Sequence, residues 1–70
     1  MNKTQNTKTG FVTDLVEGDV FYMGHDTPYV ADGVYFRHDE RGCTIDYHVL
    51  GSAVLSTVTK PKFTAVSILL

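Results

Sequence analysis

The feature that most constrains the fold is the strict alternation of residue types along residues 43–49. From Cys43 to Val49 every second residue is apolar, and the residues between them are polar. In an extended chain the apolar set would point to one side and the polar set to the other. This period of two predicts a β-strand with one buried face. No segment of the 70-residue chain has a sustained helical period, so we expect an all-β protein.

Other β-rich runs are separated by turn-forming residues, a pattern typical of small β domains. These runs are residues 20–23, 29–31, 34–37, 53–58 and 63–70. Asp32-Gly33 is a dipeptide favoured in tight hairpin turns, and we expect further turns at residues 38–42, 51–52 and 60–62. The spacing predicts a small barrel or a curled antiparallel sheet of about five to six strands. We expect the C-terminal strand to pair with the first strands or with another subunit.

A polar turn is expected before the first main strand, at residues 20–23. Asp14 can accept a hydrogen bond from a backbone N–H two or three residues further on, and Glu17 can reach back as in a capping box. Gly18 can adopt positive φ and end the turn. Leu15 is the apolar residue expected to pack this turn onto the core.

The sequence predicts a disordered polar tail over residues 1–10 and a single small β domain over residues 11–70. After Met1 the tail has no aliphatic residue. No apolar run is long enough to cross a bilayer, and the N-terminus has no apolar signal region. The single cysteine, Cys43, excludes an intrachain disulfide and fits a reducing compartment. We therefore expect a cytoplasmic protein that does not interact with a membrane.

A domain of this length buries only about 60% of the surface of its unfolded chain. Its stability is marginal unless a ligand or another subunit contributes. Together with the apolar C-terminus, this predicts a homo-oligomer.

A short motif carries a resemblance to a known group of proteins. The segment Asp14-Leu15-x-x-Gly18-Asp19-x-Phe21, followed by Pro28-Tyr29-Val30, resembles small β proteins encoded in bacteriophage genomes. The resemblance covers residues 11–37, and the motif is also found in unrelated small barrels, including SH3-like ones. It implies a phage or prophage accessory protein that binds a host or phage protein. The family has no assigned chemistry, so it implies no functional residue here.

Aromatic residues beside arginines are the strongest candidates for a binding site. Such groups form stacking platforms for single-stranded nucleic acid, and they also form the anchors of protein interfaces. We expect about half of the rings to be buried. The candidate binding residues are Tyr22, Tyr29, Tyr35, Arg37, Arg41 and Tyr47, with Phe21 and Phe36 in the same aromatic group. The net charge of −2 favours a protein partner over nucleic acid.

The sequence offers little that predicts catalysis, a metal or another cofactor. Asp46 and His48 could supply two metal ligands, but such a pair is more often part of a solvated polar strand face. Further acidic and histidine side chains lie in predicted loops at His25, Asp26, His38, Asp39 and Glu40. Cys43 lies on the predicted apolar face, where a thiol acts as a small hydrophobe. No phosphate-binding loop or catalytic triad motif is present, so we expect no enzyme activity.

Overall fold

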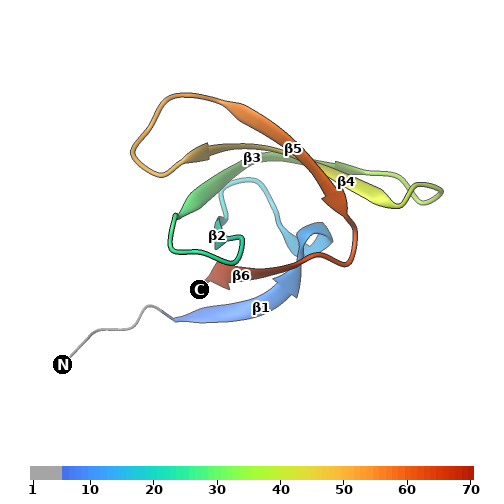
Figure 1. Ribbon diagram of the computed structural model, residues 1–70, viewed down its shortest axis with the longest axis horizontal. Helices are drawn as coiled ribbons and strands as arrows, with labels where there is room; N and C mark the ends of the chain where they lie inside the picture. The colour runs from blue at the N-terminus through green and yellow to red at the C-terminus, as the bar shows by residue number, and fades with distance from the viewer. Residues whose placement is uncertain (1–5) are drawn as a thin grey trace.

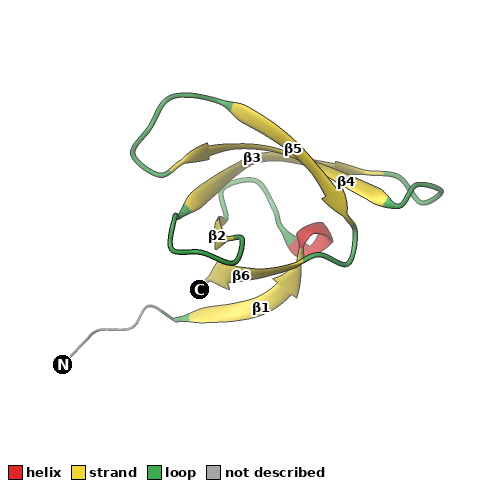
Figure 2. Cartoon of the chain, in the orientation of Figure 1, coloured by secondary structure: helices red, strands yellow, loops and turns green. Residues whose placement is uncertain are grey.

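The computed structural model describes residues 6–70, and it consists of one six-stranded antiparallel sheet with a single short helical turn. The strands are β1 (Thr7–Phe11), β2 (Val20–Tyr22), β3 (Tyr29–Phe36), β4 (Gly42–Val49), β5 (Ser56–Pro61) and β6 (Ala65–Leu69). A 3₁₀ turn, η1 (Val12–Asp14), follows β1 directly (Figure 2). The predicted all-β class and the expectation of a short turn before the strand at residues 20–23 are confirmed.

The sheet is curled and not closed into a barrel. Its strand order is β1-β6-β2-β3-β4-β5, which leaves β1 and β5 as the two edges. Figure 1 shows the β3–β4–β5 half of the sheet curled over the β1–β6–β2 half. Of the two predicted forms, the curled sheet is therefore the one observed. It leaves one side of each edge strand unpaired among residues 6–70.

Strand β6 lies inside the sheet, between β1 and β2. Its Val66 pairs with Gly10 of β1, and its Ile68 pairs with both Lys8 of β1 and Phe21 of β2. The expectation that the C-terminal strand pairs with the first strands is confirmed. The last strand of the chain therefore joins two N-terminal strands that do not pair with each other.

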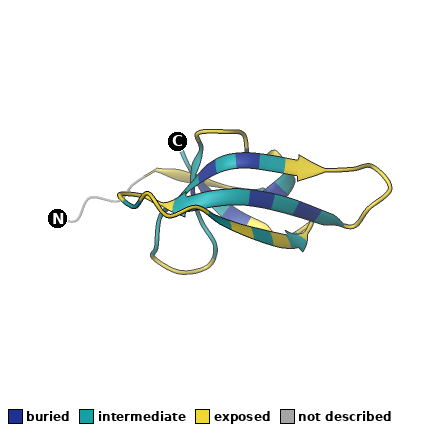
Figure 3. Cartoon of the chain, turned by 90° about the horizontal axis from the view of Figure 1, so that it is seen from above, coloured by how far each residue is buried: buried dark blue, intermediate teal, exposed yellow. Residues whose placement is uncertain are grey.

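The core is small and lies between the two halves of the sheet. Its buried residues are Val12, Leu15, Phe21, Ala31, Cys43, Ile45, Val66 and Ile68. Leu15 is buried, as predicted for the residue that packs the polar turn onto the core. Along β4 the predicted alternation holds for Cys43 and Ile45, whereas Val49, near the end of the strand, is 39% exposed. Figure 3 shows buried positions alternating with intermediate ones along neighbouring strands, and exposed positions mainly in the loops and at strand ends.

The hairpin predicted at Asp32-Gly33 is wrong, because both residues lie inside the continuous strand β3. The pairing with β4 shifts by one residue there: Ala31 pairs with Tyr47, and Gly33 pairs with Asp46. Asp32 is therefore the extra residue of a β-bulge. The ring and hydroxyl of the exposed Tyr35 side chain lie over Gly33, in the space that a Cβ would enter.

Three other predicted boundaries also change. Residues 7–10 of the predicted disordered tail belong to β1, because they pair with β6; residues 1–5 lie outside the described part of the chain. The strand predicted at 53–58 begins only at Ser56 and continues to Pro61, so the following turn starts at Lys62. The run predicted at residues 63–70 forms a strand only over Ala65–Leu69, and Leu70, which follows it, is 75% exposed.

The polar turn forms with different hydrogen bonds from those predicted. The Asp14 carboxylate accepts the N–H of Phe11, which precedes it, at 2.9 Å. The Asp19 carboxylate accepts the N–H of Val16 at 2.9 Å. Gly18 has a φ of +96°, as predicted, and its N–H donates to the carbonyl of Ala31 at 2.8 Å. The turn is thereby joined to β3, in the opposite half of the sheet from β1 and β6.

We expect Gly18→Val to lower the free energy of unfolding by about 1 kcal/mol or more, since a β-branched residue is strained at positive φ. A Cβ at Gly18 would meet no atom within 4 Å, so the loss would report backbone strain and not a clash. Gly18→Asn is the control, because asparagine adopts positive φ more readily. Urea unfolding followed by circular dichroism measures both variants. Equal losses for the two would rule out the backbone explanation.

We expect Ile68→Asp to abolish folding. Ile68 is 2% exposed at the centre of the sheet, and burial of such a side chain is worth about 1.5–3 kcal/mol before the cost of burying a carboxylate is added. Leu70→Asp is the matched control, because Leu70 lies two residues further on and is 75% exposed. Circular dichroism and melting temperature separate the two variants. A folded Ile68→Asp protein would contradict the placement of β6.

Candidate functional site

The six predicted binding residues do not form one site. Tyr29 and Tyr47 pack against the core, with ring centroids 5.1 Å apart in an edge-to-face arrangement. Tyr29 also lies 5.7 Å from the ring of Phe21, which is fully buried. Tyr35 is 58% exposed on β3, where it covers Gly33. Of the six aromatic rings, Phe21 is buried, Tyr22, Tyr29 and Tyr47 are half-buried, and Tyr35 and Phe36 are exposed.

Arg37 and Arg41 flank the β3–β4 hairpin loop, and both are exposed. Arg37 lies 4.0 Å from the carboxylate of Asp39 in the same loop. Lys62, from the β5–β6 turn, connects to this loop twice. Its N–H donates to the carbonyl of Arg41 at 2.8 Å, and its ammonium group donates to the carbonyl of Arg37. The β3–β4 hairpin and the β5–β6 turn therefore form one end of the molecule.

Three exposed phenyl rings gather at this end. Phe63 is 80% exposed, and its ring meets that of Phe11 edge to face at 5.6 Å between centroids. Phe36 is 50% exposed, and the Lys62 ammonium lies 5.6 Å from the centre of its ring, a cation–π distance. A groove lies between the hairpin loop and the turn, and it is lined by His38, Glu40, Arg41, Pro61, Lys62 and Phe63.

We name this region the hairpin-end surface. It consists of Phe11, Phe36, Arg37, Arg41, Lys60, Lys62 and Phe63. Lys60 belongs to it because it pairs with Cys43 of β4, which in turn pairs with Phe36 of β3. Several distant segments of the chain contribute to this surface, and only the sheet topology brings them together.

The charges of the chain are separated between this surface and the rest of the molecule. Four of the six lysines and arginines belong to the hairpin-end surface. Three of the eight carboxylates lie at the same end: Asp39 and Glu40 in the hairpin loop, and Asp14, which accepts the N–H of Phe11. Four cations and three carboxylates give a local net charge of +1, against −2 for the chain as a whole. A chain that is acidic overall thus presents a cationic surface beside exposed aromatic rings.

Sequence reasoning found Arg37 and Arg41 but missed Phe11, Phe63, Lys60 and Lys62 as site residues. A partial signal was present, since Phe36 precedes Arg37 and Phe63 follows Lys62 in the sequence. An aromatic residue next to a cation at two separate turn boundaries could have suggested one surface.

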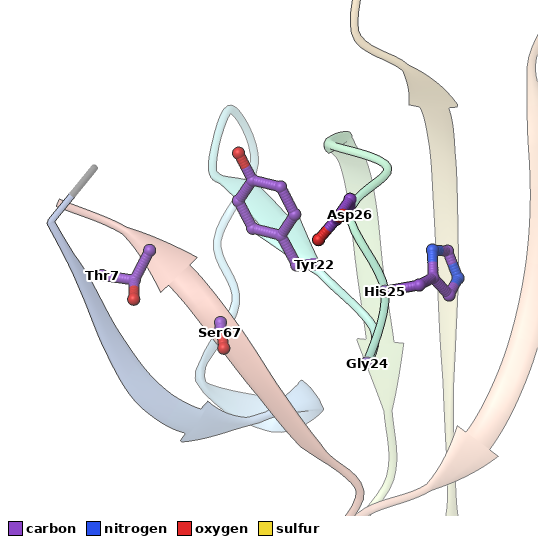
Figure 4. Close-up of a pocket in the computed structure, with 6 residues that line it drawn as sticks. All are labelled: Thr7, Tyr22, Gly24, His25, Asp26 and Ser67. Carbon is purple, nitrogen blue, oxygen red and sulfur yellow. The ribbon is translucent and has the colours of Figure 1, made fainter. Parts of the chain in front are cut away.

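A second depression, polar and open, lies at the opposite end of β6. Thr7, Tyr22, Gly24, His25, Asp26 and Ser67 line it (Figure 4). In this view the His25 ring points away from Tyr22 and Ser67. The His25 imidazole instead lies 3.4 Å from the hydroxyl of Tyr29. This second depression therefore does not place the His25 imidazole beside the Ser67 hydroxyl, as a histidine-activated serine would require.

The pair considered as metal ligands, Asp46 and His48, is engaged in separate side-chain contacts. Asp46 accepts a hydrogen bond from the Thr57 hydroxyl at 2.8 Å. His48 Nδ1 lies 2.8 Å from a carboxylate oxygen of Asp32, the bulge residue, to which it can donate. Within residues 6–70, no group of three or more histidine, cysteine, aspartate or glutamate side chains is arranged to hold a metal ion.

Cys43 is fully buried, as the alternation predicted. Burial raises the pKa of its thiol above the ordinary value of 9.0, and the nearby Lys62 ammonium opposes part of this increase. A buried thiol with a raised pKa is a poor nucleophile at neutral pH. Cys43 therefore acts as a core residue beneath the hairpin-end surface.

No protein-family model matches the chain, and no curated protein or solved structure matches it significantly. The described part of the chain also contains no helix that could span a membrane.

We expect Cys43 to react slowly with a thiol reagent in the folded protein and rapidly in urea. Because its folded pKa is raised, the unfolded thiol ionises first, so stability should fall as pH rises above about 9. Cys43→Ala should remove the cysteine part of this fall, although the smaller side chain lowers stability at every pH. Urea unfolding at a series of pH values measures both proteins. Identical pH profiles, or rapid labelling of the folded chain, would contradict this placement of the thiol.

Proposed function

We propose that this protein is a phage-type accessory protein that acts in the bacterial cytoplasm by binding another protein, without chemistry of its own. The observation that carries the proposal is the hairpin-end surface. Exposed aromatic clusters are uncommon on monomeric domains and mark interaction sites. Aromatic and arginine side chains are also the residues most enriched at protein interfaces.

The geometry of the rings supports a protein partner. Phe11 ends β1 and Phe36 ends β3, so paired strands hold both backbones in place. A rigid anchor loses little conformational entropy on binding. Phe63 and Phe11 meet edge to face at 87°, so they form a corner and not a flat stacking surface. A corner of this kind suits an apolar side chain of a partner better than a stack of bases.

Single-stranded nucleic acid is the second candidate, because the cations of the chain concentrate around the same rings. Arg37, Arg41, Lys60 and Lys62 could contact phosphates while Phe36 or Phe63 stacks on a base. The overall charge of −2 and the carboxylates of Asp39 and Glu40 oppose this function.

We expect Phe63→Ser to lose the specific partner when the immobilised protein is exposed to nuclease-treated bacterial lysate. Phe63 is 80% exposed, so the variant should fold normally, and truncation of a central anchor typically costs about 2 kcal/mol or more in binding. Leu70→Ser is the control, since Leu70 is similarly exposed but lies outside the hairpin-end surface. Quantitative mass spectrometry compares the proteins retained by each variant.

Equal retention of every protein by wild type and Phe63→Ser would contradict the proposal. Recovery that disappears with nuclease, together with retention on a single-stranded DNA resin that falls steeply with salt, would establish the nucleic-acid function instead.

A further inference from the structure

We infer that the open edge of β5 binds an extended segment of the partner, which joins the sheet as a seventh, antiparallel strand. This inference rests on the protein-binding function proposed above and adds the mode of recognition. The segment we expect carries carboxylates at its N-terminal end and apolar side chains towards its C-terminal end. Strand addition of this kind uses main-chain hydrogen bonds for affinity and flanking side chains for specificity.

The main-chain groups of β5 are arranged for such a partner. Lys62 donates its N–H to the carbonyl of Arg41, and Pro61 pairs with Gly42 in the next register position. Antiparallel hydrogen bonds alternate along a strand, so Thr57 and Thr59 direct their N–H and C=O groups away from β4. Within residues 6–70, no strand pairs with this side of β5. The edge therefore offers two donors and two acceptors in line.

The flanks of β5 differ in chemistry. Before the strand, Val54 and Leu55 are 72% and 71% exposed, and Leu50 of the same connection is 54% exposed. Lys62 follows the strand, and Arg37 and Arg41 of the hairpin-end surface lie near the same end in space. Figure 1 shows the β4–β5 connection and the β5–β6 turn at opposite ends of the strand. A strand that runs antiparallel to β5 would therefore meet cations first and apolar side chains last.

The other edge, β1, is flanked differently. Its residues Thr7, Lys8 and Thr9 are exposed and polar, and Phe11 is the large apolar residue exposed along it. Phe11 already contacts Phe63 within the hairpin-end surface. The β1 edge therefore offers main-chain groups but few apolar side chains. The β5 edge has exposed apolar side chains at one end and cations at the other.

A second copy of the chain is a less complementary occupant than an acidic segment. If two β5 edges paired antiparallel about a two-fold axis, the basic end of each strand would lie beside the apolar start of the other. Lys60 and Lys62 of each copy would then approach Leu55 and Val54, with no carboxylate to pair with. The carboxylates at the N-terminal end of a partner strand would lie at the cationic end of β5, where Lys60 is on the strand itself and the Lys62 ammonium is turned towards Arg37 and Phe36 of the hairpin. Charge complementarity of this kind favours one partner and one register.

Short peptides selected from a random displayed library against the immobilised full chain provide the probe. We expect the selected peptides to be extended, with carboxylates near the N-terminus and β-branched or aliphatic residues after them. Their affinity, measured by fluorescence polarisation with synthetic peptides, should fall about tenfold in Thr59→Pro, which lacks the outward N–H. Thr59→Val is the matched control, because it also loses the hydroxyl that contacts Thr44 but keeps the N–H.

Two further measurements keep the test decisive if Thr59→Pro fails to fold. Leu55→Asp changes a side chain that is 71% exposed, so it should fold and should weaken the acidic peptides severalfold. In amide NMR spectra of the wild type, the peptide should shift the Thr57 and Thr59 N–H signals more than that of Val58. Unchanged affinity in Leu55→Asp together with unshifted Thr57 and Thr59 signals would overturn the inference.

Other outcomes separate this inference from the function on which it rests. If the selected peptides no longer bind Phe63→Ser but bind Thr59→Pro normally, the protein-binding function would stand and strand addition would be ruled out. A dimer seen by light scattering that buries the β5 edge would assign the edge to a second copy. Preferential binding of oligothymidylate over every selected peptide would remove both proposals.

Discussion

The pairing of β6 with both β1 and β2 is the constraint on which the rest of the structure depends. It joins the C-terminal strand to two strands from the start of the chain, so the sheet forms only after long-range contacts are made, and such pairing is entropically costly. The core of the sheet is small, and it contains Ile68 of β6 and its pairing partner Phe21 of β2. Because β6 begins beside the end of β1, the turn before it places Phe63 against Phe11.

The same arrangement creates the surfaces for which we propose a function. The β5–β6 turn must cross from one half of the curled sheet to the other, and Lys62 is held at the β3–β4 hairpin by contacts with Arg37 and Arg41 as it does so. Cations and phenyl rings from separate segments therefore meet at one end of an otherwise acidic molecule. Because the sheet curls without closing, β5 has one edge next to that end that no strand within residues 6–70 pairs with. The two features are adjacent, so one partner could engage both.

Local sequence patterns predicted the parts of this structure that local physics determines. The alternation that buries Cys43 and Ile45 and the positive φ of Gly18 depend on neighbouring residues, and both were predicted. The turn predicted at Asp32-Gly33 did not form, because β3 pairs with β4 on both sides of this dipeptide and Asp32 is accommodated as a β-bulge. Most residues of the candidate surface were not predicted, for a related reason: Phe11 and Phe63 are neighbours only because β1 pairs with β6. No short-range pattern carries that information.

Amide hydrogen exchange of the free protein, resolved by NMR, tests the central claim that β6 is interior and β5 is an open edge. We expect the amide of Ser67 to exchange only through global unfolding, because antiparallel hydrogen bonds alternate along β6 and this amide faces β2 inside the sheet, whereas those of Val66 and Ile68 face the edge strand β1. The amides of Thr57 and Thr59 should exchange far faster than that of Val58 between them, because they face away from β4. Strong protection of Thr57 and Thr59 in the free protein, equal to that of β6, would show that the edge is already covered and would contradict this account.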